Sequence, residues 1–381
     1  MSWLEVLQYA TRHDPGRIVI YSEGPSTWAH LKPMVFELLE MPGESITFLT
    51  SSPTDPGLNE LPRNVTKLQI GHGVLRRIAL RSLNAAVVVT STPDLGKSYF
   101  PKSRQVSYYA YVHHSLVSTH MAYHADAFDH FDVIFCAGPH HCNETRARER
   151  RHGLRQKTLV RYGSGRIDCM ARMAAAQPAS TAEKPTILVA PSWGGQGLFE
   201  TAGGPILSAL AETGHNVIAR PHPESVKRSP KALAALMRAF DDHPRVQFDL
   251  ESPSMASFLD ARLLVSDWSG AAFEFAFATG RPVLFWDGPF KCRNPDFREL
   301  ALEPLEIAAR KELGAVFAPE DIARLPHTVT SLLRTSAFRP PSDNEAAQRH
   351  LYNVGRSAGV TRATVESLLQ HGLVKEADNG V

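Results

Sequence analysis

The chain has 381 residues, which at roughly 100–200 residues per domain predicts two domains. Hydrophobic residues make up 43% and charged residues 21%, an ordinary composition for a globular protein that excludes a disordered or collagen-like chain. The 41 Lys and Arg residues nearly balance the 39 Asp and Glu residues, and the resulting net charge of +2 argues against a dedicated nucleic-acid-binding protein.

Cysteine content and the first residues favour a cytoplasmic location. Four cysteines without a Cys-x-x-Cys pair are too few for a disulfide scaffold, so a reducing compartment is expected. The N-terminus lacks a basic leader followed by an apolar run, and residues 3–10 predict a short amphipathic helix. The most apolar long stretch, 270–286, is interrupted by Glu274 and Arg281, so no membrane span is predicted.

Short apolar runs alternate with helix-like segments in the first half of the chain. The runs are continuously apolar rather than alternating, which is typical of strands in a parallel sheet covered on both faces. The predicted strands are 17–23, 45–50, 66–70, 85–90, 105–112 and 132–137, with a helix at 27–40. This pattern predicts a doubly wound α/β domain over residues 1–170.

A second series of the same kind follows a small, polar, proline-punctuated stretch at 171–185, which is typical of a linker. Strands are predicted at 186–192, 216–223, 246–250, 263–269 and 282–286, helices at 205–212 and 230–241, and a helical segment at 345–373 that packs back across the domains. The second domain is thus expected over 186–381, with a ligand cleft between the halves. The glycine-rich patterns G-x-G-x-x-G after the first strand and G-x-x-x-x-G-K-[ST] are missing, which argues against dinucleotide dehydrogenases and P-loop ATPases.

Two histidines follow directly after the strand predicted at 105–112. Ligands of open α/β sheets bind beyond the carboxyl ends of the strands, so His113 and His114 lie where catalytic groups are expected. A histidine can take a proton from an attacking hydroxyl, although a purely structural pair is the simpler interpretation. Metal binding is a further alternative, given the donors His113, His114, His120, His124, Asp126, Asp129, His140, His141 and Cys142, but their spacing matches no recognised zinc pattern.

Two motifs in the second half suit a phosphate group. Arg220-Pro221-His222-Pro223 follows a predicted strand, and its prolines stiffen a loop that presents an arginine and a histidine. The stretch 265–274 predicts a strand end, a small-residue turn and a helix start, with Ser269 as the N-cap and Gly270 leaving the first N–H groups accessible. A cap alone is the simpler interpretation of Ser269. The basic residues Arg146, Arg148, Arg150, Arg151, Arg155 and Lys157 predict either a solvated helix face or a contact with anionic lipid.

The order and spacing of these motifs resemble the CDP-glycerol glycerophosphotransferases, the teichoic-acid primases and polymerases of the GT-B type. The resemblance covers roughly residues 106–362. The matching stretches are 113–117, 130–132, Gly163 to Asp168, Val189 to Trp193, Arg220 to Pro223, Ser266 to Glu274, and 280–282. The sequence departs from the family pattern in the first motif, which lacks its Trp and Thr-Pro, and at Gly270 and Glu274, where the family has Ser and Asp.

The resemblance implies a GT-B-like fold of two Rossmann-like domains facing a cleft, and a transferase that moves glycerophosphate from CDP-glycerol to an acceptor hydroxyl with release of CMP. It implies His114 and His222 as catalytic residues, His114 being the general base, and no metal or other cofactor. The implied donor-binding residues are His113, Ser115, Arg166, Pro191, Ser192, Arg220, His222, Asp267, Ser269, Gly270 and Glu274. The implied acceptor is lipid-linked or polymeric, with peripheral contact to an anionic membrane at its cytoplasmic face. A glycosyltransferase using a UDP- or CMP-sugar for surface polysaccharide, and a non-catalytic nucleotide-binding module, remain alternatives.

Overall fold

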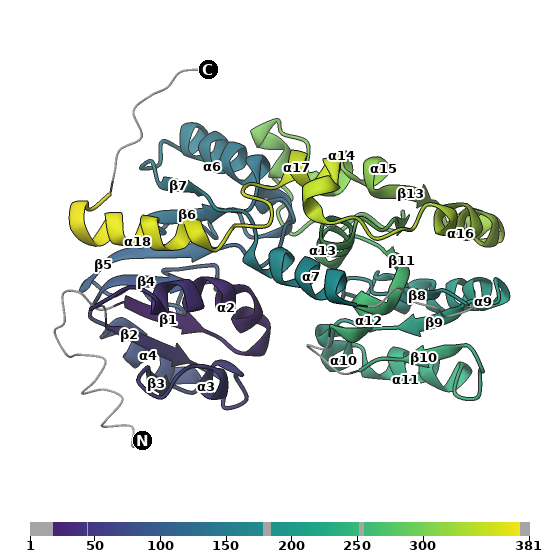
Figure 1. The fold of residues 1–381 in the computed structure, drawn as a ribbon, viewed down its shortest axis with the longest axis horizontal. Coiled ribbons are helices and arrows are strands. Elements are labelled where there is room, and N and C mark those ends of the chain that lie inside the picture. Colours follow the sequence, from purple (N-terminus) through teal and green to yellow (C-terminus); the bar gives the residue numbers. More distant parts are fainter. Residues whose placement is uncertain (1–17, 44, 178–183, 251–254, 374–381) are drawn as a thin grey trace.

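Two parallel sheets, each flanked by helices, form the protein (Figure 1). The computed structural model describes residues 18–43, 45–177, 184–250 and 255–373. The amphipathic helix expected at 3–10 lies outside the described residues. Within them, the predicted fold class is confirmed: the protein is α/β with two Rossmann-like domains.

The first sheet has seven parallel strands in the order β3-β2-β1-β4-β5-β6-β7. All six strands predicted in this half are present, and β7 is an addition. The strands are β1 (Ile18–Ser22), β2 (Ile46–Thr50), β3 (Thr66–Gln69), β4 (Ala85–Thr90), β5 (Val106–Val112), β6 (Val133–Cys136) and β7 (Thr158–Arg161). The helices are α2 (Pro25–Leu39), α3 (Gly57–Glu60), α4 (Gly73–Arg81), α5 (Thr119–Ala122), α6 (Pro139–His152) and α7 (Gly165–Ala176). Every residue of β1, β2 and β4 is buried, as the continuous apolar runs predict.

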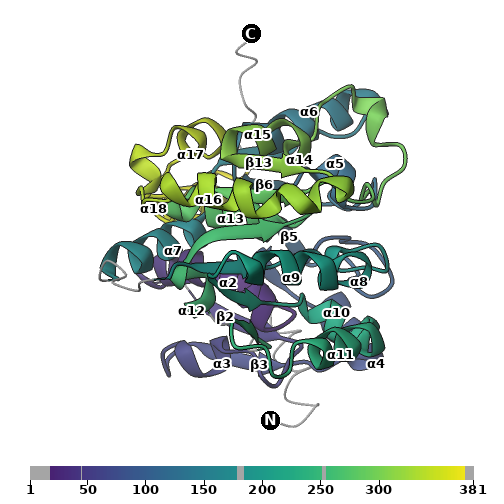
Figure 2. The ribbon, with the colours of Figure 1, turned by 90° about the vertical axis from the view of Figure 1, so that its right-hand side faces the viewer.

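The second sheet has six parallel strands in the order β10-β9-β8-β11-β12-β13. They are β8 (Thr186–Val189), β9 (Asn216–Ala219), β10 (Val246–Phe248), β11 (Ala261–Ser266), β12 (Val283–Trp286) and β13 (Gly314–Phe317). The helices are α8 (Leu198–Thr201), α9 (Gly203–Glu212), α10 (Pro223–Arg228), α11 (Pro230–Ala239), α12 (Ala256–Asp260), α13 (Gly270–Thr279), α14 (Leu305–Ala308), α15 (Arg310–Leu313), α16 (Leu325–Arg334), α17 (Glu345–His350) and α18 (Gly359–His371), with short 3-10 turns at Phe297–Leu300, Pro319–Arg324 and Pro341–Asp343. Helices α9 and α16 cover the outer face of this sheet (Figure 2).

Helix α13 joins the two domains. Eight of its residues are buried, and its phenylalanines share one apolar cluster with Ile167 and Met170 of α7 in the first domain. Leu116, which follows the histidine pair, belongs to the same cluster. Because this cluster is built from both halves of the chain, the helix that begins at Gly270 is held against the first domain by apolar burial.

The structure changes two of the predicted boundaries. Helix α7 continues to Ala176, so residues 171–176 of the expected linker are helical. Helix α18, which the domain division placed in the second domain, packs on α2 of the first, where Val365 and Leu368 enter the core. The prediction that the C-terminal segment crosses back is confirmed, although it forms two helices rather than one. Gly138 allows this crossing, because a Cβ there would lie 1.8 Å from the carbonyl oxygen of His350.

Candidate active site between the domains

The donor-binding motifs predicted in the second half lie where the strand order of the second sheet reverses. In the first sheet β1 lies between β2 and β4, and in the second β8 lies between β9 and β11. Ligands of doubly wound sheets bind outside the carboxyl ends of the strands at such switch points. The loops that leave β8, β9 and β11 carry Ser192, His222 and Ser269, which places the predicted donor-binding motifs at the switch point of the second sheet.

His114 is held in one orientation by three oxygen atoms. Its Nδ1 lies 2.9 Å from both the carbonyl oxygen of Ser91 and the hydroxyl of Tyr111, and its Nε2 lies 3.2 Å from the hydroxyl of Tyr123. Because a carbonyl oxygen only accepts hydrogen bonds, this pattern assigns the proton of the neutral ring to Nδ1. Nε2 is then the basic nitrogen and accepts a hydrogen bond from Tyr123.

The imidazole of His114 is neutral at physiological pH. Burial lowers its pKa to about 4, and the hydrogen bond to Ser91 opposes this only in part. The ring of His30, on α2, lies 6.2 Å from it. A neutral ring can receive a proton on Nε2, the nitrogen to which Tyr123 donates, so His114 has the protonation state that a general base needs.

The loop that carries His114 touches the start of α13. A Cβ added at Gly270 would lie 2.4 Å from the Oγ of Ser115, so the glycine leaves room for the two loops to approach this closely. Ser269 caps the helix, its Oγ accepting a hydrogen bond from the backbone N–H of Ala271 at 3.3 Å. The structure thus brings the histidine loop of the first domain to the N-terminus of α13, an end that favours anions.

His113 has a different environment from the one expected. It is buried, and its ring stacks on that of His141 with 3.6 Å between centroids. Tyr111 and Phe128 also pack against it. Burial lowers the pKa of His113 well below its usual range, and neither ring nitrogen has a hydrogen-bond partner among the described residues. The expected contact of His113 with the donor stays a prediction.

Metal binding was the alternative role for these histidines. In the described ranges, no group of three His, Cys, Asp or Glu side chains is placed to hold a metal ion. His120, one of the histidines considered for it, pairs with Glu144, with 3.3 Å between Nδ1 and Oε1. Glu144 also accepts hydrogen bonds from the backbone N–H and hydroxyl of Thr119, at 2.6 and 2.5 Å. These two side chains hold the loop after β5 against α6.

Arg166 and Glu274 form an ion pair between the domains, with 3.1 Å from Nε to Oε2. Arg166 lies at the start of α7 and Glu274 within α13. Both side chains are mostly buried, so each satisfies the charge of the other. The carboxylate of Glu274 thus positions Arg166 and the two helices, and its expected contact with the donor stays a prediction.

Arg220 and His222 lie at the carboxyl end of β9, as predicted. The guanidinium of Arg220 donates to the hydroxyl of Ser257 at 3.0 Å and lies 3.7 Å from the carboxylate of Asp249. His222 caps α10, its Nδ1 accepting a hydrogen bond from the backbone N–H of Glu224 at 3.1 Å. The proton of the neutral ring is therefore on Nε2, and because burial lowers the pKa of His222 to about 4, this ring is a neutral hydrogen-bond donor.

Asp267 organises the loop after β8. Its carboxylate accepts hydrogen bonds from the backbone N–H groups of Ser192 at 2.6 Å and Leu198 at 3.4 Å. Both carboxylate oxygens of Asp267 therefore hold the loop that begins at Pro191, and the expected contact of Asp267 with the donor stays a prediction. The buried hydroxyl of Ser192 has no partner among the described residues, so it remains a candidate contact.

Several residues of this region were missed by the sequence analysis. Tyr123 follows a short helix in a stretch without a recognisable motif, yet it bonds His114. Lys291 donates to the carbonyl oxygen of Trp193 at 2.6 Å, beside the glycine-rich loop. The guanidinium of Arg310 lies 3.6 Å from the ring centroid of Trp268, next to Ser269. Trp193 and Trp268 belong to motifs that the sequence analysis named. No local sequence pattern indicates that either residue contacts a distant cation.

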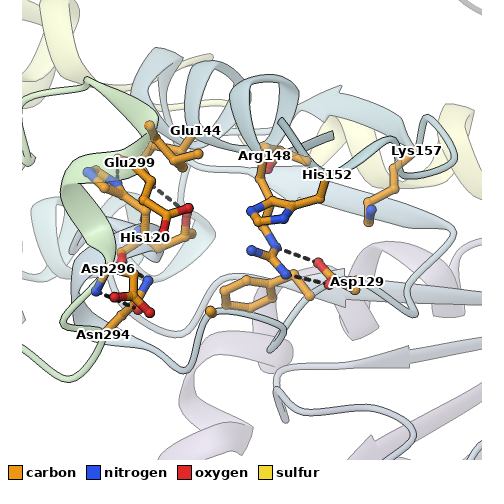
Figure 3. Close-up of a pocket in the computed structure, with 14 residues that line it drawn as sticks. His120, Asp129, Glu144, Arg148, His152, Lys157, Asn294, Asp296 and Glu299 are labelled. Atoms are coloured by element: carbon orange, nitrogen blue, oxygen red, sulfur yellow. Dashed lines mark hydrogen bonds and ion pairs between the residues drawn. The ribbon is translucent and has the colours of Figure 1, made fainter. Parts of the chain in front are cut away.

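Most of the basic residues between Arg146 and Lys157, on α6 and directly after it, pair with groups within the protein. Arg148 donates two hydrogen bonds to Asp129, at 2.7 and 2.6 Å, on the wall of a cavity of about 130 Å³ between α6 and residues 294–300 (Figure 3). Arg146 pairs with Glu149 at 2.6 Å, and Arg155 pairs with Asp132 at the same distance. These contacts favour a structural role for the run over the expected contact with anionic lipid.

Several solved structures have folds similar to that of this chain, and they identify its fold class. A variant of the wall teichoic acid polymerase TagF with CDPG has a TM-score of 0.61 at 13% identity, over 97% of this chain and 94% of that one. UDP-GlcNAc 2-epimerase from Methanocaldococcus jannaschii, in complex with UDP-GlcNAc and UDP, has a TM-score of 0.59 at 13% identity, over 92% and 99%. Another UDP-N-acetylglucosamine 2-epimerase reaches 0.56 at 13%, over 97% and 100%. The protein therefore has a GT-B-like fold. No protein-family model and no curated protein matches the chain.

None of the helices in the described residues is both long and apolar enough to cross a membrane.

Proposed function

We propose that the protein is a transferase that moves a glycerophosphate or related polyol-phosphate unit from CDP-glycerol to an acceptor hydroxyl, releasing CMP. The observation that carries this proposal is the contact between Ser115 and Gly270, which joins a histidine base on the first domain to an anion-favouring helix end on the second. The proposed setting is the synthesis of a teichoic-acid-like, capsular or O-antigen polymer at the cytoplasmic face of the membrane.

In the proposed reaction, Nε2 of His114 takes the proton of the acceptor hydroxyl as its oxygen attacks the β-phosphorus. A new oxygen–phosphorus bond forms, the bond from the β-phosphorus to the bridging oxygen breaks, and CMP leaves with that electron pair. Arg220, the Nε2–H of His222 and the N-terminus of α13 stabilise the negative charge on the phosphates. Positioning and charge stabilisation account for most of the catalysis in phosphoryl transfer, so these residues suit the task.

A donor screen tests the proposal. The full-length protein is incubated with CDP-glycerol, other CDP-polyols, UDP-sugars and CMP-sugars, each with a polyol-phosphate acceptor, and nucleotide release is measured. Release of CMP from CDP-glycerol or another CDP-polyol, and no turnover of the sugar nucleotides, is the expected result. The His114→Asn variant, which keeps a polar side chain of similar size, is the matched control and is expected to release almost none.

Other outcomes would replace the proposal by a named alternative. Turnover of a UDP- or CMP-sugar alone would identify a glycosyltransferase. Conversion of UDP-GlcNAc without any acceptor would identify an epimerase, the activity named for two of the similar structures. Tight nucleotide binding without turnover of any donor would identify a binding module.

A further inference from the structure

A cavity of about 470 Å³ lies at the carboxyl edge of the first sheet. Its wall is formed by Asp94 in the loop after β4, by the segments 97–99 and 124–126, and by Arg293 of the second domain. Strand β4 lies beside β1, at the point where the strand order of this sheet reverses, and doubly wound sheets bind ligands at such points. The residues of this cavity are distinct from the donor-binding residues expected on the second sheet.

The cavity adjoins the two segments that hold His114. Ser91, whose carbonyl oxygen lies 2.9 Å from Nδ1 of His114, is three residues before Asp94. Tyr123, whose hydroxyl lies 3.2 Å from Nε2, directly precedes His124. A molecule in the cavity therefore lies on the first-domain side of the base, where the proposed reaction needs its acceptor.

Asp94 has hydrogen-bonding capacity that the protein does not use. The residue is 7% exposed, and its Oδ2 accepts a hydrogen bond from the hydroxyl of Tyr99 at 2.5 Å, whereas its Oδ1 has no hydrogen-bond partner among the described residues. The backbone of Asp94 has a φ of 63°, in the left-handed region that few residues other than glycine adopt. Because an unpartnered buried carboxylate oxygen lowers stability, a role in binding accounts for it better than a role in folding.

Two cations line the same cavity. The guanidinium of Arg293 donates a hydrogen bond to Nε2 of His124 at 2.9 Å, and among the described residues it pairs with no carboxylate. The backbone N–H of Arg293 donates to the carbonyl oxygen of Met121 at 3.0 Å, which fixes this residue against the first domain. Lys97 forms an ion pair with Asp126, but both side chains are more than 40% exposed, so an anion can replace this contact at little cost.

These side chains select a ligand with two kinds of group. A carboxylate accepts hydrogen bonds from hydroxyls, whereas guanidinium and ammonium groups bind phosphate oxygens. We propose that the cavity lined by Asp94, Lys97 and Arg293, named the Asp94 cavity, binds the acceptor and selects one that carries a hydroxyl close to a phosphate group. Asp94 accepts the hydrogen bond of the hydroxyl, while Arg293 and Lys97 bind the phosphate. The assignment to the acceptor rests on the proposed function, whereas binding in the cavity can be measured without turnover.

Calorimetry with small probes tests the ligand class. The full-length protein, in the presence of excess CDP to fill the donor site, is titrated with glycerol 3-phosphate, inorganic phosphate or glycerol. Glycerol 3-phosphate should bind at least about tenfold more tightly than either of the other probes, because only this molecule uses both the carboxylate and the cations. Equal binding of inorganic phosphate, or no binding of glycerol 3-phosphate, would overturn the inference.

Two substitutions test the residues. Arg293→Gln removes a cation at an exposed position, and Asp94→Asn keeps the size of the side chain, an oxygen acceptor for Tyr99 and a residue type that tolerates the left-handed region. Each should raise the Kd for glycerol 3-phosphate, and the acceptor KM in the CMP-release assay, about tenfold or more, while the Kd for CDP changes less than about twofold. Arg293→Lys keeps the charge and should recover most of the binding. The matched control is Arg298→Gln, the same loss of charge at an exposed position nearby, which should leave every value unchanged.

The outcomes separate this inference from the proposed function. CMP release with parent values of the acceptor KM in both variants, or an equal loss in Arg298→Gln, would refute the Asp94 cavity as the acceptor site and leave the proposed function intact. Binding of glycerol 3-phosphate that depends on Arg293, without CMP release from any CDP-polyol, would refute the proposed function and leave the cavity as a polyol-phosphate site. Melting temperatures measured by circular dichroism should match the parent protein, and if Asp94→Asn fails to fold, the exposed Arg293 variants decide the question.

Discussion

Glu306 provides a direct test of how the two domains are joined. Its carboxylate is fully buried at the domain interface and accepts a hydrogen bond from the backbone N–H of Ser118 at 2.9 Å. The side chain of Ser118 forms a second bond to the same segment: its Oγ accepts a hydrogen bond from the backbone N–H of Leu305 at 2.7 Å. Burial raises the pKa of Glu306 from 4.5 to about 7, with the nearby Glu144 adding to the effect.

This raised pKa makes stability fall as the pH rises. Between pH 4.5 and about 7 the unfolded chain has released the proton of Glu306 while the folded protein still holds it. Each pH unit of that difference is worth about 1.4 kcal/mol, so the parent protein should lose up to about 3 kcal/mol across the window. Glu306→Gln keeps an oxygen acceptor for Ser118 and carries no charge at any pH.

We therefore expect Glu306→Gln to be close to neutral at pH 4.5 and to stabilise the protein by up to about 3 kcal/mol at pH 8. Urea denaturation of both proteins across this range, followed by tryptophan fluorescence, measures the difference. Glu303→Gln is the matched control: Glu303 is exposed, just before the helix α14 that carries Glu306, and its substitution should leave the pH dependence unchanged. A constant effect of Glu306→Gln from pH 4.5 to 8 would show that Glu306 does not titrate in this window and would refute the reasoning.

Further predictions concern the proposed reaction. His114→Asn should lower kcat about 10²- to 10⁴-fold while calorimetry finds an unchanged Kd for CDP, since the base faces the acceptor; full activity would remove His114 from this role. Arg220→Gln and His222→Asn should each raise the Kd for CDP roughly ten- to hundredfold, the asparagine keeping the helix cap, and loss of melting temperature with unchanged Kd would instead indicate a packing role. Tyr123→Phe should move the acidic limb of the kcat/KM profile to higher pH, by up to about one unit, because Nε2 of His114 would lose a hydrogen bond that favours the neutral ring. Activity should survive EDTA, since Arg220, His222 and the α13 N-terminus supply the charge stabilisation; a loss reversed by one divalent ion would contradict this.

Local sequence patterns determined the elements and the ends of strands at which the motifs lie. Strands covered on both faces are largely apolar, so β1 and β4 were recognisable as nearly continuous apolar runs. The cap at Ser269 and the stiff loop at Arg220 could also be predicted from the sequence, because capping and proline geometry act within a few residues. The parallel topology then places such motifs at one edge of each sheet.

The roles of individual side chains depended on contacts between distant parts of the chain. Asp267 and Glu274 look like ligand contacts in a motif, but the first holds a loop 75 residues away and the second pairs with Arg166, 108 residues away. Helix α18 lies on the first domain because its apolar face completes the core of that domain. The hydrophobic pattern of the helix alone does not say which domain it covers. The sequence alone therefore predicted the fold class and the regions of the candidate site, because apolar strand patterns and turn chemistry act over a few residues. Only the tertiary structure decided which contacts those residues make within the protein, because their partners are distant in the chain.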